Sequence, residues 1–85
     1  MSHKSEILKA LGHPTRLQMV TGLLTAPLNV GELGDLTGCQ QANTSQHLHV
    51  LFHAGIVEAE RSGVVKNYHI RREIRPTIQA IIEAL

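Results

Sequence analysis

The chain has 85 residues, a formal net charge of +1 and one cysteine, Cys39. A chain of this length is expected to fold as one small domain over 1–85, and one cysteine cannot form an intrachain disulfide, so a partner subunit is expected to add stability. The near-neutral charge argues against a protein whose whole surface adheres to nucleic acid. The opening residues lack the apolar run of a signal peptide and no segment is long enough to cross a bilayer, which predicts a cytoplasmic protein without a membrane partner.

Charge is unevenly distributed along the chain. Within 30–57 the only charged residues are Glu32 and Asp35, whereas five of the eight Lys and Arg residues lie within 61–75. A cluster of cations is by itself most often a solvated surface. Here the cluster follows a segment, residues 36–57, without Lys, Arg, Asp or Glu. That order suggests that the two segments act together.

Two helices are predicted in the N-terminal part. The first is expected over 5–11, and the second begins at Pro14, where a missing N–H costs nothing, and continues to about 24. His13 is expected to cap this second helix. The side chains expected on the inner sides of the two helices are Ile7, Leu8 and Leu11 in the first and Leu17, Val20, Leu23 and Leu24 in the second.

A helix-turn-helix unit is predicted next. Asn29 can cap a helix over 30–37 that Gly38 ends, and a turn of three or four residues leads to a helix over 41–54 that Gly55 ends. Two helices joined by so short a turn are typical of this unit.

After this unit the apolar residues alternate instead of following helical spacing. IVEAE and VVKNYHI, separated by residues 61–64 with their glycine, predict a two-stranded hairpin. Pro76 can open a last helix with an aliphatic stripe. The predicted fold is mainly α with a small β-hairpin: helix, helix, helix-turn-helix, hairpin, helix, which is a winged helix-turn-helix. The stripe of the last helix consists of Ile78, Ile81, Ile82 and Leu85.

The helix over 41–54 divides into two sides when residues are placed 100° apart. Thr44, Leu48 and Leu51 fall on one side and are expected in the core, with His47 at its border. The opposite side is uncharged and polar, as a helix in the major groove of DNA would be: Gln can bond to adenine, Ser to several base edges, and an Ala methyl can pack on a thymine methyl. The alternative is an ordinary solvated helix face. The residues of this side are Ala42, Ser45, Gln46, His49 and His53.

The neighbouring hairpin favours the DNA-binding interpretation. Its Arg61, Lys66 and Asn67 can contact phosphates and supply affinity, while the polar helix face supplies sequence choice. This division explains why the helix itself needs no cation.

Three segments together resemble a known family. They are LKALGHPTRLQMVTGLL (8–24), NVGELGDLTGCQQANTSQHLHVLFHAGIVEAERSG (29–63) and KNYHI (66–70). With its HPTRL opening and its S-x-H-L-x-V-L-x-x-A-G-I-V run, the chain resembles the ArsR/SmtB repressors of bacteria and archaea over almost its whole length. The resemblance implies a homodimeric winged-helix repressor that leaves double-stranded operator DNA when it binds an effector, here an unidentified small molecule, or is oxidised.

The resemblance also implies which residues act. Dimerisation through the first and last helices would use Ile7, Leu8, Leu11, Ile78, Ile81, Ile82 and Leu85, whose alternative is ordinary intrachain core. The DNA-contacting surface of the family maps here to Gln41, Ala42, Asn43, Ser45, Gln46 and His49 on the helix and to Arg61, Lys66 and Asn67 on the wing. Phe52 departs from the family, whose members usually carry a charged residue there; it either thickens the core or leaves an apolar spot on the surface.

The known sensor sites of the family lack their ligands in this sequence. The thiolate motif ELCVC reads ELGDL here, the last helix has no histidine, and Thr21 stands where a persulfide sensor has a cysteine. His49 and His53 have metal-chelating spacing, but two ligands make an incomplete zinc site. No metal or other cofactor is therefore expected. Cys39 remains either a one-cysteine redox switch or a small buried hydrophobe.

These residues fit three classes of function to different degrees. A sequence-specific DNA-binding repressor, acting as a homodimer on an inverted repeat, fits best. A winged-helix dimer used for protein contact, with little DNA binding, is the alternative, kept open by the near-neutral charge and Phe52. An enzyme fits least, because no nucleophile, base and orienting group are brought together.

Overall fold

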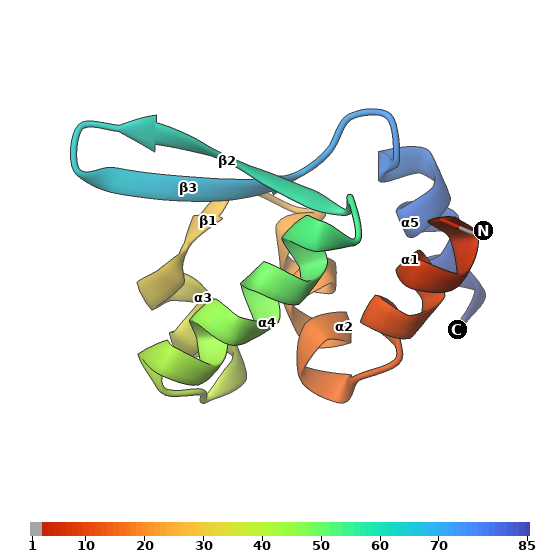
Figure 1. Ribbon diagram of the computed structural model, residues 1–85, viewed down its shortest axis with the longest axis horizontal. Helices are drawn as coiled ribbons and strands as arrows, with labels where there is room; N and C mark the ends of the chain where they lie inside the picture. Colours follow the sequence, from red (N-terminus) through yellow and green to blue (C-terminus); the bar gives the residue numbers. More distant parts are fainter. Residues whose placement is uncertain (1–2) are drawn as a thin grey trace.

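The computed structural model describes residues 3–85 and confirms a winged helix-turn-helix (Figure 1). Hairpin β2–β3 lies across one side of the helices and extends beyond them at one end, whereas α1 and α5 lie at the opposite end. The elements in chain order are α1 His3–Leu11, α2 Pro14–Leu23, β1 Leu28–Asn29, α3 Val30–Thr37, α4 Gln41–His53, β2 Val57–Ser62, β3 Val65–Ile70 and α5 Arg75–Ala84.

The helix boundaries follow from local interactions, of which the sequence predicted the caps by His13 and Asn29 and the end at Gly38. The His13 Nδ1 accepts a bond from the Thr15 amide at 3.1 Å and caps α2. Asn29 and Glu32 form a reciprocal capping box at the start of α3, with bonds of 2.8 and 2.9 Å. Gly38 ends α3 with a φ of 75°, in the left-handed region that glycine adopts without strain.

The sheet has a third strand that the sequence analysis missed. Strand β1 is two residues long and pairs antiparallel with β3, which gives the order β1-β3-β2. So short a strand carries no alternation of its own, and it forms because β3 offers it a free edge. The hairpin turn is also shorter than predicted. Arg61 and Ser62 continue β2, and only Gly63 and Val64 connect the strands, with Gly63 supplying the positive φ that a two-residue turn requires.

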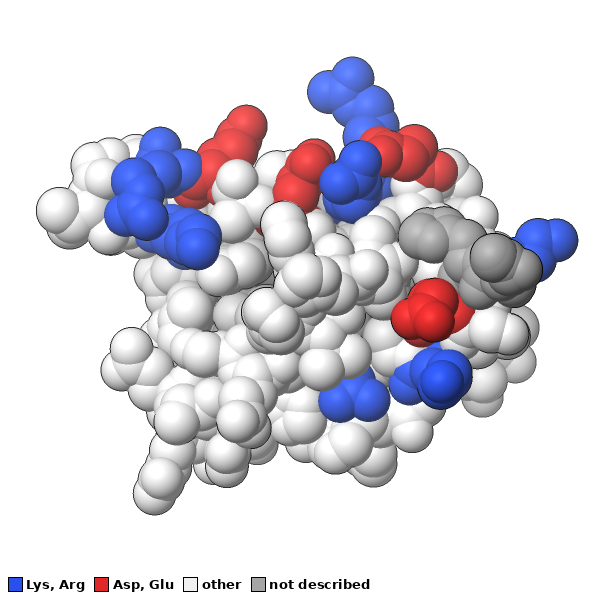
Figure 2. Space-filling view, in the orientation of Figure 1, with Lys and Arg blue, Asp and Glu red and all other residues white. Residues whose placement is uncertain are grey.

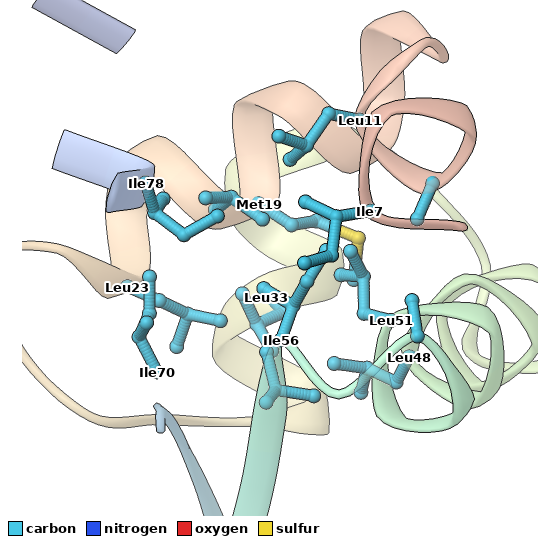
Figure 3. Packing of buried hydrophobic residues seen from close by; sticks show 14 residues of the cluster. Ile7, Leu11, Met19, Leu23, Leu33, Leu48, Leu51, Ile56, Ile70 and Ile78 are labelled. Atoms are coloured by element: carbon cyan, nitrogen blue, oxygen red, sulfur yellow. The ribbon is translucent and has the colours of Figure 1, made fainter. Parts of the chain in front are cut away.

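One aliphatic core joins the helices to the base of the sheet (Figure 3). Val20 and Leu23 are buried as predicted, but Met19 is buried too and Leu17 only partly so, because Met19 precedes Leu23 by one turn and shares its side of α2. The described side chains that are fully or almost fully buried are Ile7, Ala10, Leu11, Met19, Val20, Leu23, Leu33, Thr44, Leu48, Leu51, Ala54, Ile56, Val57, Ile70 and Ile78.

The two outer helices are divided between this core and the surface. Ile7, Leu11 and Ile78 lie in the core of the single chain, as the alternative of intrachain packing has it, and their contact with a partner stays a prediction. Ile81 and Ile82 are half-buried against the core. Leu8 on α1 and Leu85, just after α5, remain exposed, with 60% and 83% of their surface accessible, and are available to a partner.

Candidate nucleic-acid interface

Helix α4 has a buried side and an exposed polar side. Thr44, Leu48 and Leu51 are buried, as the helical spacing predicted. The Thr44 hydroxyl donates to the carbonyl oxygen of Gln40 at 3.0 Å and is thereby satisfied in the core. The exposed side chains include all six that were expected to contact DNA from this helix, namely Gln41, Ala42, Asn43, Ser45, Gln46 and His49.

The turn before α4 packs closely against α3 and fixes the angle of the unit. A Cβ on Gly34 would lie 3.1 Å from the carbonyl oxygen of Cys39 and 3.4 Å from the Thr44 hydroxyl. Glycine at this place therefore lets the backbone of the turn approach α3. The close approach holds α4 against α3 with its polar side turned outward.

The wing presents its cations on the side that faces α4. Arg61 and Lys66 are directly opposite in the register of β2 and β3, so they share one face of the hairpin with the pair Ala59–Tyr68. Ala59, Lys66 and Tyr68 line a hollow together with residues of α4, which shows that this face turns towards the helix. Figure 2 shows Lys and Arg side chains gathered near the free end of the hairpin, at the upper left, and no charged side chain on the surface over α4.

The acidic residues of the hairpin lie on its other face. Glu58 and Glu60 alternate with Arg61 along β2 and line a separate hollow with His69. Glu58 is also paired, at 3.0 Å with the His69 ring and at 3.7 Å with the Arg71 guanidinium. The cationic face of the wing therefore has no carboxylate of the hairpin on it.

Asn67 does not join the other predicted contacts. It alternates with Lys66 on β3 and therefore lies on the face of Glu60, opposite which it pairs. It also pairs with Asn29 of β1 and is half-buried. The exposed residues of α4, Arg61 and Lys66 thus lie on one side of the molecule. Asn67 lies on the opposite face of the hairpin.

A cluster of three basic side chains, which was not predicted from the sequence, lies between α4 and the start of α2. Arg16 donates through Nε to the carbonyl oxygen of Ala10 at 2.6 Å, and its Nη1 lies 3.3 Å from Nδ1 of His47. The ring of His13 lies 4.6 Å from that of His47. Burial, and then the nearby His13 and Arg16, hold the pKa of His47 below its usual value. Neutral His47 thus ties α4 to the start of α2.

Phe52 is on the surface, which settles the two alternatives raised by the sequence. It is 51% exposed on α4, and its ring lies edge-on to that of His53 with centroids 5.6 Å apart. The His53 ring in turn lies 4.2 Å from that of His49. Three rings therefore follow one another on the exposed side of the helix, and that of Phe52 is the apolar one.

Comparison of sequences identifies the family. Residues 13–59, from the cap of α2 to the middle of β2, match the family model described as bacterial regulatory protein, arsR family. The chain belongs to the arsR family. The match covers the whole helix-turn-helix of this ArsR-family protein and the first half of strand β2 of its wing.

Named relatives and solved structures agree with this assignment. The biofilm growth-associated repressor of Xylella fastidiosa is 43% identical over 58 residues, which are 68% of this chain and 51% of the repressor, so the chain spans about half the length of that relative. The transcriptional regulator YgaV of Escherichia coli is 35% identical over 80 residues, 93% of this chain and 78% of YgaV. A winged helix-turn-helix DNA-binding domain from Mycobacterium bovis, described as homodimeric, has a TM-score of 0.90 at 25% identity over 96% of this chain and 77% of that one.

Cys39 is the candidate sensor residue of this ArsR-family chain. Cys39 is half-buried in the turn before α4 and lines a shallow hollow with Gly34 and Asp35, so its role as redox switch or core residue stays a prediction. Within residues 3–85, no group of three or more His, Cys, Asp or Glu side chains is placed to hold a metal ion. None of the described helices is both long and apolar enough to span a bilayer.

Proposed function

We propose that this chain is a sequence-specific DNA-binding repressor that acts in the cytoplasm as a homodimer on an inverted-repeat operator, and that it is not an enzyme. The observation that carries the proposal is the common orientation of two surfaces. The uncharged polar side of α4 and the Arg61–Lys66 pair of the wing face the same side of the molecule. The repressor from Xylella fastidiosa supports the regulatory role by its similarity.

The two surfaces would act on different parts of the duplex. Small and amide-bearing side chains such as Ser45 and Gln46 can reach base edges when α4 lies in the major groove. Arg61 and Lys66, exposed on the wing, would contact phosphates of the adjacent backbone. Affinity would then come mainly from the wing, and sequence preference mainly from the helix.

The homodimer would form at the end of the molecule away from the tip of the wing. Figure 1 shows α1 and α5 at that end. Leu8 on α1 and Leu85 after α5 are exposed, and Ile81 and Ile82 of α5 are half-buried. Full burial contributes roughly 1.5–3 kcal/mol for each such side chain. The similar domain from Mycobacterium bovis, described as homodimeric, supports this arrangement.

Selection of bound DNA from a random pool tests the proposal. Two α4 helices related by a two-fold axis should select an inverted repeat whose half-site centres are about one helical turn, roughly 10 bp, apart. Enrichment of such a repeat is the expected result. A pool that stays random after repeated rounds at low salt would contradict the proposal.

The alternative function is a winged-helix dimer that contacts another protein, and the exposed Phe52 favours it. Salt dependence separates the two functions. Affinity for DNA should fall steeply as salt rises, in proportion to the number of phosphates contacted, with a slope of about −0.9 for each in a logarithmic plot. A protein-contact module would show weak DNA binding with little preference for any sequence.

A further inference from the structure

A hollow between α4 and the wing has features that DNA contact alone does not require. It has a volume of about 250 Å³ and lies where the cation-bearing face of the hairpin meets the exposed side of the helix. Leu48 and Ala59 are in its wall together with three aromatic or imidazole rings of α4 and the ring of Tyr68. The full set of lining residues is Ser45, Leu48, His49, Phe52, His53, Ala59, Lys66 and Tyr68.

The walls combine the rings of Phe52 and Tyr68, two imidazoles and one positive charge. The Lys66 ammonium lies over the Tyr68 ring, 5.6 Å from its centroid, and is thereby held at the hollow. No residue that lines the hollow is acidic. Half of the surface of Phe52 is accessible to solvent. A flat apolar group that covers this ring removes apolar surface from water and so lowers the free energy. The complementary ligand is therefore a planar ring that carries an anionic group.

We propose that this hollow binds a small aromatic carboxylate, one ring with one carboxylate, which acts as an effector of the protein. The ring would pack on Phe52 and Tyr68, and the carboxylate would pair with the Lys66 ammonium. The volume is sufficient, because an apolar cavity of about 150 Å³ accommodates benzene. Sites for small ligands commonly combine apolar and aromatic walls with polar groups that fix orientation. In this hollow the polar groups are the Ser45 hydroxyl, the two imidazoles, the Tyr68 hydroxyl and the Lys66 ammonium.

The position of the hollow implies how the ligand would regulate the protein. This inference about regulation rests on the proposed function. Ser45, His49 and Lys66 line the hollow and also belong to the surface proposed to contact DNA. A ligand bound there would neutralise the charge of Lys66 and occupy the space between helix and wing that a phosphate backbone would enter. Binding of the aromatic carboxylate and binding of DNA would therefore exclude each other without a change of fold.

Titration of the protein with benzoate, without DNA, tests the site. Calorimetry or amide chemical shifts should give a dissociation constant on the order of 1 mM, as expected for so small a ligand. Benzamide lacks the charge and acetate lacks the ring, and each should bind at least fivefold more weakly. Acetate or inorganic phosphate binding as tightly as benzoate would contradict the aromatic part of the proposal, and equal binding of benzamide would contradict the ionic part.

Variants of the lining residues identify where benzoate binds. Phe52→Ala and Lys66→Gln should each weaken benzoate binding at least fivefold. Both residues are exposed, so the fold should persist, and the far-ultraviolet circular dichroism checks this. Val50→Ala is the matched control, since Val50 is also exposed on α4 but lines a different hollow. Equal losses in Val50→Ala, or unchanged binding in Phe52→Ala, would overturn the site.

Displacement of DNA is measured separately. Benzoate should release the selected operator from the wild-type protein. The half-maximal concentration, once corrected for competition by the DNA, should equal the dissociation constant from the direct titration. Release by benzamide at equal concentration would contradict the regulatory role. Because the direct titration contains no DNA, it decides the ligand site even if the chain binds no operator, so failure of the site and failure of the proposed function remain distinguishable.

Discussion

Helix α4 and the wing differ in how they are stabilised and in what they present. Residues 41–53 contain no Lys, Arg, Asp or Glu. One side of the helix is anchored in the core by buried side chains such as Leu48 and Leu51. The free end of the wing has no buried residue, with Val64 93% exposed, and it carries Arg61 and Lys66. A rigid uncharged surface suits discrimination between bases, whereas a projecting cationic strand pair suits contact with phosphates that are the same in every sequence.

The largest effect is expected at the buried side of α4. Leu51→Ala should lower the free energy of unfolding by about 2–5 kcal/mol, because it removes a fully buried side chain and leaves a cavity. Urea denaturation followed by circular dichroism measures this. Val50→Ala, one residue away on the exposed side, should cost less than about 1 kcal/mol. Similar losses in both variants would contradict the division of the helix into two sides.

The exposed side of α4 should affect discrimination and not stability. Gln46→Ala should reduce the preference of the protein for its selected half-site at one base pair by about 1–3 kcal/mol, the usual value of a bidentate base contact. Competition between operators that differ at single positions measures this preference. Gln79→Ala on α5 is the control and should leave every position unchanged. A uniform loss of affinity for all sequences in Gln46→Ala would show that Gln46 contacts the backbone.

The start of α3 should have a smaller effect on stability. Asn29→Ala removes the side-chain acceptor of the capping box and should cost about 1 kcal/mol. Asn29→Asp keeps an oxygen acceptor at the same place and should retain most of the stability. Thermal unfolding of the two variants side by side measures the difference, and equal melting temperatures would argue against the cap.

The smallest effect concerns the support of α4 by His47. Its pKa in the folded protein is lowered, mainly by burial and further by His13 and Arg16, so the unfolded chain takes up this proton more readily than the folded one. The contribution of neutral His47 to stability should therefore be present above about pH 6.5 and be lost as the pH falls. The glutamine side chain does not titrate, so His47→Gln should flatten the pH dependence of the free energy of unfolding between about pH 7.5 and 5.5. A steeper dependence in the variant would contradict the assigned direction.

Much of the fold followed from local signals in the sequence. The two sides of α4, the cap of α3 and the glycine that ends α3 depend on interactions within a few residues, which is why spacing and residue type predicted them. Strand β1 could not be predicted in this way, because two residues have no periodicity and Leu28 becomes a strand only through pairing with Tyr68 of β3.

The outer helices show a second limit. Helical spacing identified the apolar side of α5, but it could not tell which surface covers that side. Ile78 is covered by the chain's own core, whereas Leu85 is not covered. The site had the same limit. Alternation showed that neighbours on β3 face opposite ways, but only the register with β2 shows that Lys66, and not Asn67, shares the face of Arg61.

The division of roles between α4 and the wing is tested most directly by measuring affinity against salt for two variants and two duplexes, the selected operator and a scrambled one. Lys66→Ala should reduce the logarithmic salt slope by about 0.9 on both duplexes and leave the ratio of their affinities unchanged, because one phosphate contact is lost. Gln46→Ala should leave both salt slopes unchanged and reduce the ratio of the affinity for the operator to the affinity for the scrambled duplex. A narrowed ratio in Lys66→Ala together with a reduced slope in Gln46→Ala would contradict the account.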